Sequence, residues 1–239
     1  AMARLAAGGA RAQADYLKRF LADSIVRDFE HLRRTEFGGS PWVTLGQSYG
    51  GFLTLTYLSL FPEGVAASFT CGGIPHVPAN ATEVYEHTFP RMARKTAQFY
   101  ERYGVDADRV AAVADQLPTV AEIAEAGGIG GDSGSLPEGT PLLPNGDPLT
   151  VERLQCLGSD FGMKPSFERV HWIFDDAFVD GDGSVSAGAA LSDEFLAKVM
   201  NATSSRPLYW PLQEFIYANG ELDEPIRWAA LRVRDTMPR

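Results

Sequence analysis

The pattern of apolar positions changes near residue 74. Before it, short apolar runs at residues 42–45 and 65–71 predict buried strands, and a longer run at residues 52–61 predicts a buried helix that ends before Pro62. A strand, a helix and a second strand in this order are typical of a βαβ unit. We therefore expect two parallel strands joined by a right-handed crossover.

The segment before residue 42 predicts helix and no strand. Residues 1–13 are rich in alanine and glycine, and we expect them to be frayed. From Asp15 onward the apolar spacing is helical, with Asp23 as the predicted N-cap of a helix. Arg33 and Arg34 fall in the last turn of that helix, where cations suit the helix dipole.

After residue 74 the pattern is that of amphipathic helices, without a convincing strand. A long Gly/Pro-rich loop interrupts them at residues 127–148. We accordingly expect two domains, a small α/β part at residues 1–75 and an all-helical part at residues 76–239 whose last residues lead back to the first. The helices are predicted at residues 83–103, 106–126, 150–163, 166–178, 192–203, 207–219 and 225–234.

Composition excludes several classes of protein. The chain has 239 residues and a formal net charge of −10, which argues against a nucleic-acid-binding surface. No apolar run is long enough to span a membrane, and the first residues lack the apolar core of a signal peptide, so we expect a cytoplasmic protein. Two cysteines make neither a disulfide framework nor a zinc cluster. We expect no metal and no cofactor.

The chemically informative motif lies between the first predicted strand and the buried helix. Gly46-Gln47-Ser48-Tyr49-Gly50 has the form G-x-S-x-G, and in a strand–turn–helix context this form is typical of a nucleophile elbow. Ser48 is the predicted nucleophile, and the backbone N–H of Tyr49 is a predicted oxyanion-hole donor. Gly46 and Gly50 are expected to be required because a side chain there would collide with neighbouring backbone. The alternative is a serine in a tight turn without a catalytic role.

A serine nucleophile needs a histidine base that a carboxylate orients. The chain has four histidines, and His31 precedes the motif, while His87 and His171 lie inside predicted helices. His76 follows the second predicted strand and is placed to line a site. In folds built around a nucleophile elbow, the histidine base follows a later strand. None of the four histidines is therefore assigned as the base, and the carboxylate that would orient it is not assigned either.

Several segments resemble the prolyl aminopeptidase (proline iminopeptidase) family of α/β-hydrolases. The resemblance implies a partial α/β-hydrolase core, made of strand, nucleophile elbow, helix and strand, with a large all-helical cap insertion. It further implies a serine peptidase that releases N-terminal proline from peptides with a free N-terminus, by a Ser-Asp-His mechanism without metal. The resembling segments are residues 23–28, 42–52, 56–59, 72–75, 143–150 and 213–220.

The same resemblance suggests where substrate binds. Cap glutamates of the family bind the free amino group of the substrate, and Glu214 matches one of them by its place in the motif. Tyr217 lies three residues further on the same helix face and would help to shape the pocket. The alternatives are a solvated helix residue for Glu214 and simple core packing for Tyr217.

The chain departs from the family in what surrounds the motif. A Gly-rich oxyanion loop before the elbow and the catalytic Asp and His after it have no counterpart, so the sequence predicts a truncated member. Two other interpretations therefore stay open. One is a different capped hydrolase, such as an esterase or an epoxide hydrolase. The other is a non-catalytic fragment that forms a homo-oligomer through exposed strand edges and apolar surface.

Overall fold

A computed structural model describes residues 8–73, 77, 80–128, 136–164, 166–179, 188–217 and 225–237. The chain divides into two compact units, and each is described by itself. The first unit comprises Ala1–Thr88 together with Leu208–Arg239, and the second comprises Phe89–Pro207. The described residues contain no helix with the length and apolar character that a membrane span requires.

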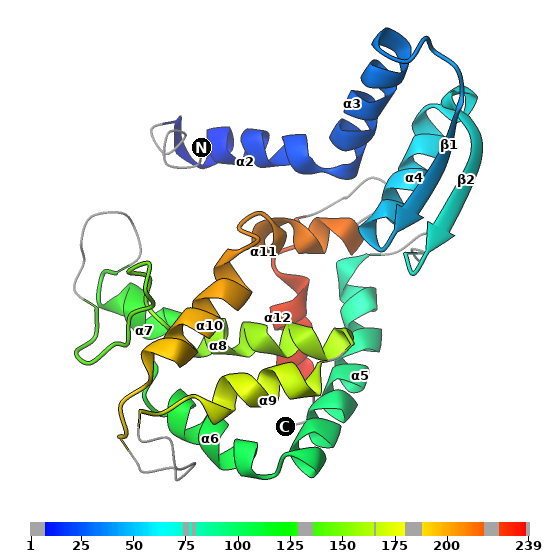
Figure 1. Cartoon of the computed structure of the whole chain (residues 1–239). Helices are drawn as coiled ribbons and strands as arrows, with labels where there is room; N and C mark the ends of the chain where they lie inside the picture. The colour runs from blue at the N-terminus through cyan, green and yellow to red at the C-terminus, as the bar shows by residue number, and fades with distance from the viewer. Residues whose placement is uncertain are drawn as a thin grey trace. The chain divides into compact units, whose positions relative to one another are not determined.

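The first unit contains the predicted βαβ arrangement. Strand β1 (Trp42–Gln47) pairs in parallel with β2 (Val65–Cys71), and α4 (Tyr49–Leu60) and the short 3₁₀ turn η3 (Pro62–Gly64) connect them. Helix α4 packs against both strands (Figure 1). The parallel pairing predicted from the apolar runs is therefore confirmed, and the helix begins directly after Ser48.

Two helices precede the sheet, α2 (Gly9–Leu17) and α3 (Ala22–Thr35), with η2 (Lys18–Phe20) between them. We predicted that residues 1–13 are frayed, but from Gly9 onward they form the helix α2. In this helix Arg11 forms an ion pair with Asp15, one turn later. Asp23 is not the N-cap of α3. The extended residue Leu21 takes that position without a side-chain hydrogen bond, and Asp23 lies in the first turn, where a carboxylate suits the helix dipole.

The sheet presents two chemically different faces. Alternate residues of a strand point to opposite faces, and Gly46 approaches Thr54 of α4, so the even-numbered residues of β1 face that helix. The odd-numbered residues Val43 and Leu45 face away and are 68% and 74% exposed. Leu45 is in register with Phe69 of β2, which is 59% exposed. One face is thus covered by helix, and the other carries apolar side chains that no described residue covers.

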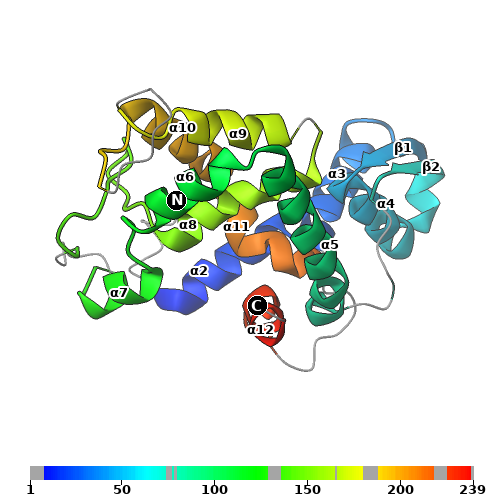
Figure 2. The ribbon, with the colours of Figure 1, turned by 90° about the horizontal axis from the view of Figure 1, so that it is seen from below.

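The second unit is helical and has its own core. Helix α9 (Phe167–Asp175) packs against α6 (Val105–Ala114) and α10 (Asp193–Ser204), as Figure 2 shows. The core includes Phe99 on α5 (Ala81–Arg102) and Phe195 on α10, which are 1% and 0% exposed. The predicted helix at residues 106–126 is wrong in its length. It divides into α6 and α7 (Val120–Glu125), because Thr119 starts a new helix with a capping box to Glu122.

The remaining elements follow the predicted helices with changed bounds. The segment at residues 150–163 forms α8 (Val151–Gln155) and η4 (Cys156–Gly162). The segment at residues 207–219 forms α11 (Tyr209–Leu212) and η5 (Gln213–Tyr217), and the last helix is α12 (Ala229–Thr236). Elements α11, η5 and α12 belong to the first unit, so this unit extends beyond residue 75 in sequence and takes in the C-terminal segment.

Candidate active site

Ser48 has the backbone conformation that a nucleophile elbow requires. It lies between β1 and α4 with φ 55° and ψ −120°, a conformation that L-residues rarely adopt. Its N–H donates to the Cys71 carbonyl (2.9 Å), and its carbonyl accepts from the Gly51 N–H (2.9 Å). These bonds hold the serine in place from both sides, and its hydroxyl makes no capping hydrogen bond to α4. The strained backbone is thus maintained by the surrounding strand and helix.

The turn is possible because neighbouring backbone segments approach each other closely at glycines. An ideal Cβ on Gly46 would lie 2.0 Å from the Gly50 carbonyl oxygen. A Cβ on Gly51 would lie 1.9 Å from the Gly73 oxygen, and one on Gly73 would lie 1.8 Å from the Ser48 oxygen. The predicted crowding exists at Gly46, whereas a Cβ on Gly50 would meet nothing within 4 Å. The sequence interpretation missed Gly51 and Gly73, although both stand in Gly-Gly pairs.

Tyr49 is the first residue of α4, a position where a backbone N–H has no acceptor within the helix. That N–H is therefore suited to a developing negative charge beside Ser48. The phenol of Tyr49 is half-buried, and burial, followed by the nearby charge of Asp23, raises its pKa. The side chain accordingly stays neutral, and its ring packs 6.1 Å from that of Phe52.

The described histidines lie on helices other than α4. His31 lies on α3, and His87 lies on α5. His171 belongs to the other compact unit, where its Nδ1 is 2.8 Å from the Oδ2 of the buried Asp106 and its ring stacks on Tyr103. Within the described part of the chain, no histidine is hydrogen-bonded to Ser48. His76 lies outside the described residues.

Glu214, the predicted ligand of an amino group, is buried in the first unit. Its side chain caps α12, because Oε2 accepts from the Ala229 N–H and Oε1 accepts from the Ala230 N–H, each at 2.9 Å. The residue is 3% exposed, so the alternative of a solvated helix residue is wrong. A carboxylate at a helix N-terminus is stabilised by the partial positive charge there.

The Tyr85 hydroxyl lies close to this carboxylate, and further tyrosines lie near Tyr85. The ring of Tyr217 meets that of Tyr85 edge to face at 5.9 Å. Burial raises the pKa of Tyr85 above its usual range, and the Glu214 carboxylate raises it further. Burial also raises the pKa of Tyr217, with Tyr209 as a smaller cause. Tyr85 was missed by sequence reasoning because helical spacing on α5 gives no indication of a partner so far away in sequence.

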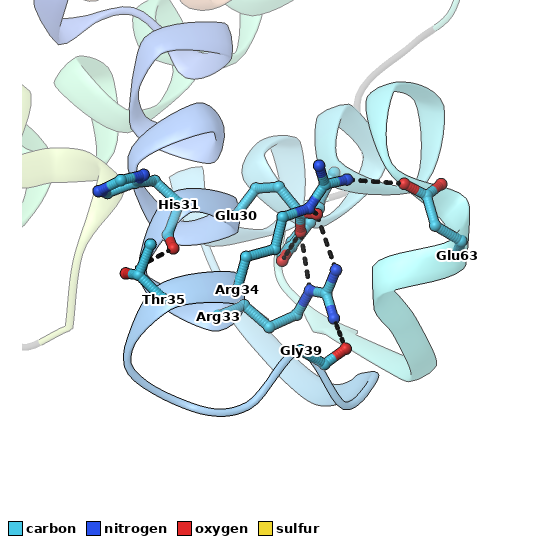
Figure 3. Close-up of polar contacts among 8 residues, drawn as sticks. Glu30, His31, Arg33, Arg34, Thr35, Gly39 and Glu63 are labelled. Atoms are coloured by element: carbon cyan, nitrogen blue, oxygen red, sulfur yellow. Dashed lines mark hydrogen bonds and ion pairs between the residues drawn. The ribbon is translucent and has the colours of Figure 1, made fainter.

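A second feature missed from the sequence is a buried ionic cluster behind the elbow helix (Figure 3). Glu30 of α3 accepts from Arg33 Nε (Oε2, 2.8 Å), from Arg33 Nη2 (Oε1, 2.8 Å) and from the Tyr57 hydroxyl of α4 (Oε2, 2.8 Å). Glu30 and Arg33 are 3% and 4% exposed. The Arg33 hydrogen bonds are the main reason that the pKa of Glu30 falls to about 2. The cluster therefore fixes α3 against the helix that follows Ser48.

The same arginines hold the two turns that precede the strands of the sheet. Arg33 also donates to the Gly39 carbonyl in the turn before β1. Arg34 donates to Glu30, and its Nη2 lies 3.2 Å from the Glu63 Oε1 in η3 (Figure 3). Arg33 was predicted only as a cation that suits the end of the helix. Its burial depends on contacts with α4 and the turn, which helical spacing does not reveal.

Comparison with known proteins shows which proteins the chain is similar to. Residues 5–104, which include β1, the elbow, α4 and β2, match the family described as alpha/beta hydrolase fold. A proline iminopeptidase of Aeromonas sobria is 38% identical over 230 residues, which are 95% of this chain and 47% of that protein. The chain is a relative of the proline iminopeptidases. The resemblance predicted from the sequence is thereby confirmed.

A second proline iminopeptidase, aneH of Aspergillus aculeatus, is 28% identical over 238 residues, covering 97% of this chain and 47% of that protein. The chain thus spans about half the length of the curated proline iminopeptidases it matches. The predicted fold class is also confirmed, as a partial α/β-hydrolase core with a large helical part. Among the described residues, no group of three or more His, Cys, Asp or Glu side chains is arranged to hold a metal ion.

Proposed function

We propose that this chain carries the nucleophile of a serine hydrolase that releases N-terminal proline from peptides. The single observation that carries the proposal is the backbone of Ser48, held at φ 55° between a parallel strand and a helix in a G-x-S-x-G turn. Similarity to two proline iminopeptidases over nearly the whole chain supports the substrate class.

In this proposal the Ser48 hydroxyl attacks the carbonyl carbon of the N-terminal residue. Its proton passes to a general base and then to the leaving amine, and water hydrolyses the acyl-enzyme. The Tyr49 N–H at the start of α4 stabilises the negative charge on the carbonyl oxygen. The strained turn keeps the serine oxygen clear of the helix. No general base is assigned among the described residues.

Glu214 and Tyr217 are proposed to recognise the free amino group and the small ring of a prolyl residue. Support comes from the burial of the carboxylate, from the Tyr85 hydroxyl beside it and from the contact of the Tyr85 and Tyr217 rings. The two carboxylate oxygens accept two backbone N–H groups and a hydrogen bond from Tyr85, and a further lone pair remains that an ammonium group can use. The bond to α12 fixes the carboxylate, so the recognising group is ordered before substrate arrives.

The experiment uses a chimera in which this chain replaces the aligned 230 residues of the Aeromonas sobria enzyme. The measured quantity is kcat/KM for a proline arylamide. Ser48→Ala should lower it by several orders of magnitude, on the order of 10⁶-fold, because members of a catalytic triad act as a unit. The control is Ser59→Ala on the exposed side of α4, where the hydroxyl only bonds to Leu55 of its own helix. Equal rates for the Ser48→Ala chimera and its parent would contradict the proposal.

A second candidate is a capped hydrolase that does not require a free amine, such as an esterase. One observation favours it: both Glu214 oxygens already bind the amides of α12, which accounts for the burial of the carboxylate without any ligand. An N-acetylated proline arylamide separates the two candidates. If the chimera cleaves the acetylated and free substrates at equal rates, Glu214 is a helix cap alone. If the chimera rejects the acetylated substrate and the Glu214→Gln variant no longer distinguishes the two substrates, Glu214 recognises the free amine.

A further inference from the structure

The buried side of α4 consists of small and polar residues. Its buried residues are Gly51, Thr54 and Tyr57, which lie three positions apart and so share one side of the helix. Gly51 lies against the Gly73 backbone, and Tyr57 donates to Glu30 of the ionic cluster. Thr54 lies between them, is 6% exposed and has no part in the proposed reaction. Burying a hydroxyl costs free energy unless it is hydrogen-bonded, so the partner of Thr54 is informative.

Thr54 contacts the elbow with both branches of its side chain. Its hydroxyl donates to the Gly51 carbonyl at 2.8 Å. Its Cγ2 methyl group faces Gly46, two residues before Ser48, since an ideal Cβ on Gly46 would lie 2.8 Å from that methyl carbon. The hydroxyl thus contacts the first turn of α4, and the methyl group contacts the end of β1.

Gly51 connects Thr54 to the candidate nucleophile. Its N–H donates to the Ser48 carbonyl at 2.9 Å, and its own carbonyl accepts the threonine hydroxyl. Gly51 has no side chain that could fix it, so its peptide groups are held by these bonds and by close backbone packing. A threonine hydroxyl that bonds back to a helix carbonyl shifts the geometry of that helical turn. The hydroxyl of Thr54 therefore acts on the turn that holds the strained serine.

We propose that Thr54 is a positioning residue for the Ser48 elbow and acts through Gly51. Its hydroxyl fixes the first turn of α4, which carries the Tyr49 N–H and the amide that holds the Ser48 carbonyl. The consequence for catalysis rests on the proposed function, in which the serine oxygen and the Tyr49 N–H must keep a defined separation. Thr54 acts on this geometry and not on the binding of substrate, so it contributes to kcat and not to KM.

Two substitutions separate the branches of the side chain. Thr54→Val keeps the methyl group and removes the hydroxyl, whereas Thr54→Ser keeps the hydroxyl and removes the methyl group. Thr56→Val is the matched control, because the Thr56 hydroxyl bonds to the Phe52 carbonyl of the same helix at 2.9 Å and is only partly buried. The first measurement is hydrolysis of the proline arylamide by the Aeromonas chimera, with kcat and KM determined separately. The second is hydrogen exchange of the Gly51 amide in the chain itself.

We expect Thr54→Val to lower kcat about tenfold and to change KM by less than about twofold, because it removes one buried hydrogen bond that substrate does not share. Exchange of the Gly51 amide should accelerate by a similar factor relative to the Phe61 amide, which bonds to Tyr57 at the other end of α4. Thr54→Ser should restore most of both losses, and Thr56→Val should change neither quantity.

A Thr54→Val chimera with the parental kcat would overturn the inference. A Thr54→Ser chimera as slow as Thr54→Val would do so too, because packing and not the hydroxyl would then position the turn. Equal acceleration of exchange at Gly51 and Phe61 would also overturn it, since the loss would then belong to the whole helix.

The proposed function and the role of Thr54 fail in different ways. If Ser48→Ala leaves hydrolysis unchanged, the proposed function is contradicted, and the Gly51 amide alone decides about Thr54. The same holds if the chimera does not fold: selective acceleration at Gly51 supports the positioning of the turn, and its absence overturns it. If Ser48→Ala abolishes hydrolysis while Thr54→Val leaves kcat unchanged, only the role of Thr54 is contradicted.

Discussion

The helical unit and the elbow-bearing unit are stabilised in different ways. In Phe89–Pro207, fourteen apolar side chains of the described residues form one buried cluster, to which α5, α6 and α8–α10 all contribute. In the unit that holds Ser48, the sheet exposes Leu45 and Phe69, and a buried ionic cluster around Glu30 joins α3 to α4. One unit has an apolar core of its own. The other fixes its elbow by polar contacts on one side and leaves its apolar side open.

This difference has a physical basis in helix and sheet geometry. A helix buries a single stripe, so a bundle of a few helices can bury all its apolar stripes against one another. A parallel sheet has two faces and two edges, and two strands with one helix cannot cover them all. Among the described residues, the elbow-bearing unit therefore leaves one apolar sheet face exposed, whereas the helical unit buries a continuous apolar core.

The largest expected effect contrasts the core of the helical unit with the bare sheet face. Phe195→Ala removes a side chain of 0% exposure and should cost about 3–5 kcal/mol of unfolding free energy. Leu45→Ala removes an exposed side chain and should change it by less than about 0.5 kcal/mol. Urea unfolding of the two variants measures both values. Equal costs would show that the sheet face is already covered in the isolated chain.

The ionic cluster should be nearly as important to the elbow-bearing unit. Glu30→Ala leaves the Arg33 guanidinium buried without its carboxylate and should cost about 3 kcal/mol. The double variant Glu30→Met, Arg33→Leu should recover much of this loss, since it buries no unpaired charge. Hydrogen exchange of the α4 amides reports on this unit. An unchanged exchange rate in Glu30→Ala would contradict the positioning role of the cluster.

The same cluster predicts an acid sensitivity confined to the elbow-bearing unit. The folded pKa of Glu30 is lowered from 4.5 to about 2, so its stabilisation is complete above pH 4.5 and is lost as the pH falls toward 2. The protection factors of the α4 amides, which correct for the intrinsic pH dependence of exchange, should fall across that window in the parent protein and change less in Glu30→Gln. Glu36→Gln, at the exposed end of α3, is the control and should keep the parental profile.

The smallest predicted effect concerns the break between α6 and α7. Thr119→Ala removes the hydroxyl that accepts from the Glu122 N–H and should cost about 1 kcal/mol. Thr119→Ser keeps the hydroxyl and should cost little. Thermal melting compares the two variants. If Thr119→Ser lost as much stability as Thr119→Ala, the methyl group of Thr119, and not its hydroxyl cap, would stabilise this turn.

Much of the fold and part of the candidate site could be predicted from the sequence. The parallel strands and α4 follow from local apolar runs, and the elbow follows from a five-residue motif. Asp23 was predicted wrongly as a cap, because a carboxylate suits the N-cap and the first turn almost equally. The contacts of Glu30 with Tyr57 and of Tyr85 with Tyr217 could not be predicted, since the two residues of each pair lie 27 or more positions apart in sequence.

The sequence by itself determined the order of the elements and the place of Ser48, because both depend on residues within a few positions of one another. Only the tertiary structure decided that Glu214 caps α12, that Arg33 is buried and that Leu45 is bare. Those properties depend on which distant segment packs against a side chain. Periodicity shows that a residue faces one side of a strand or helix, but it does not show whether anything covers that side.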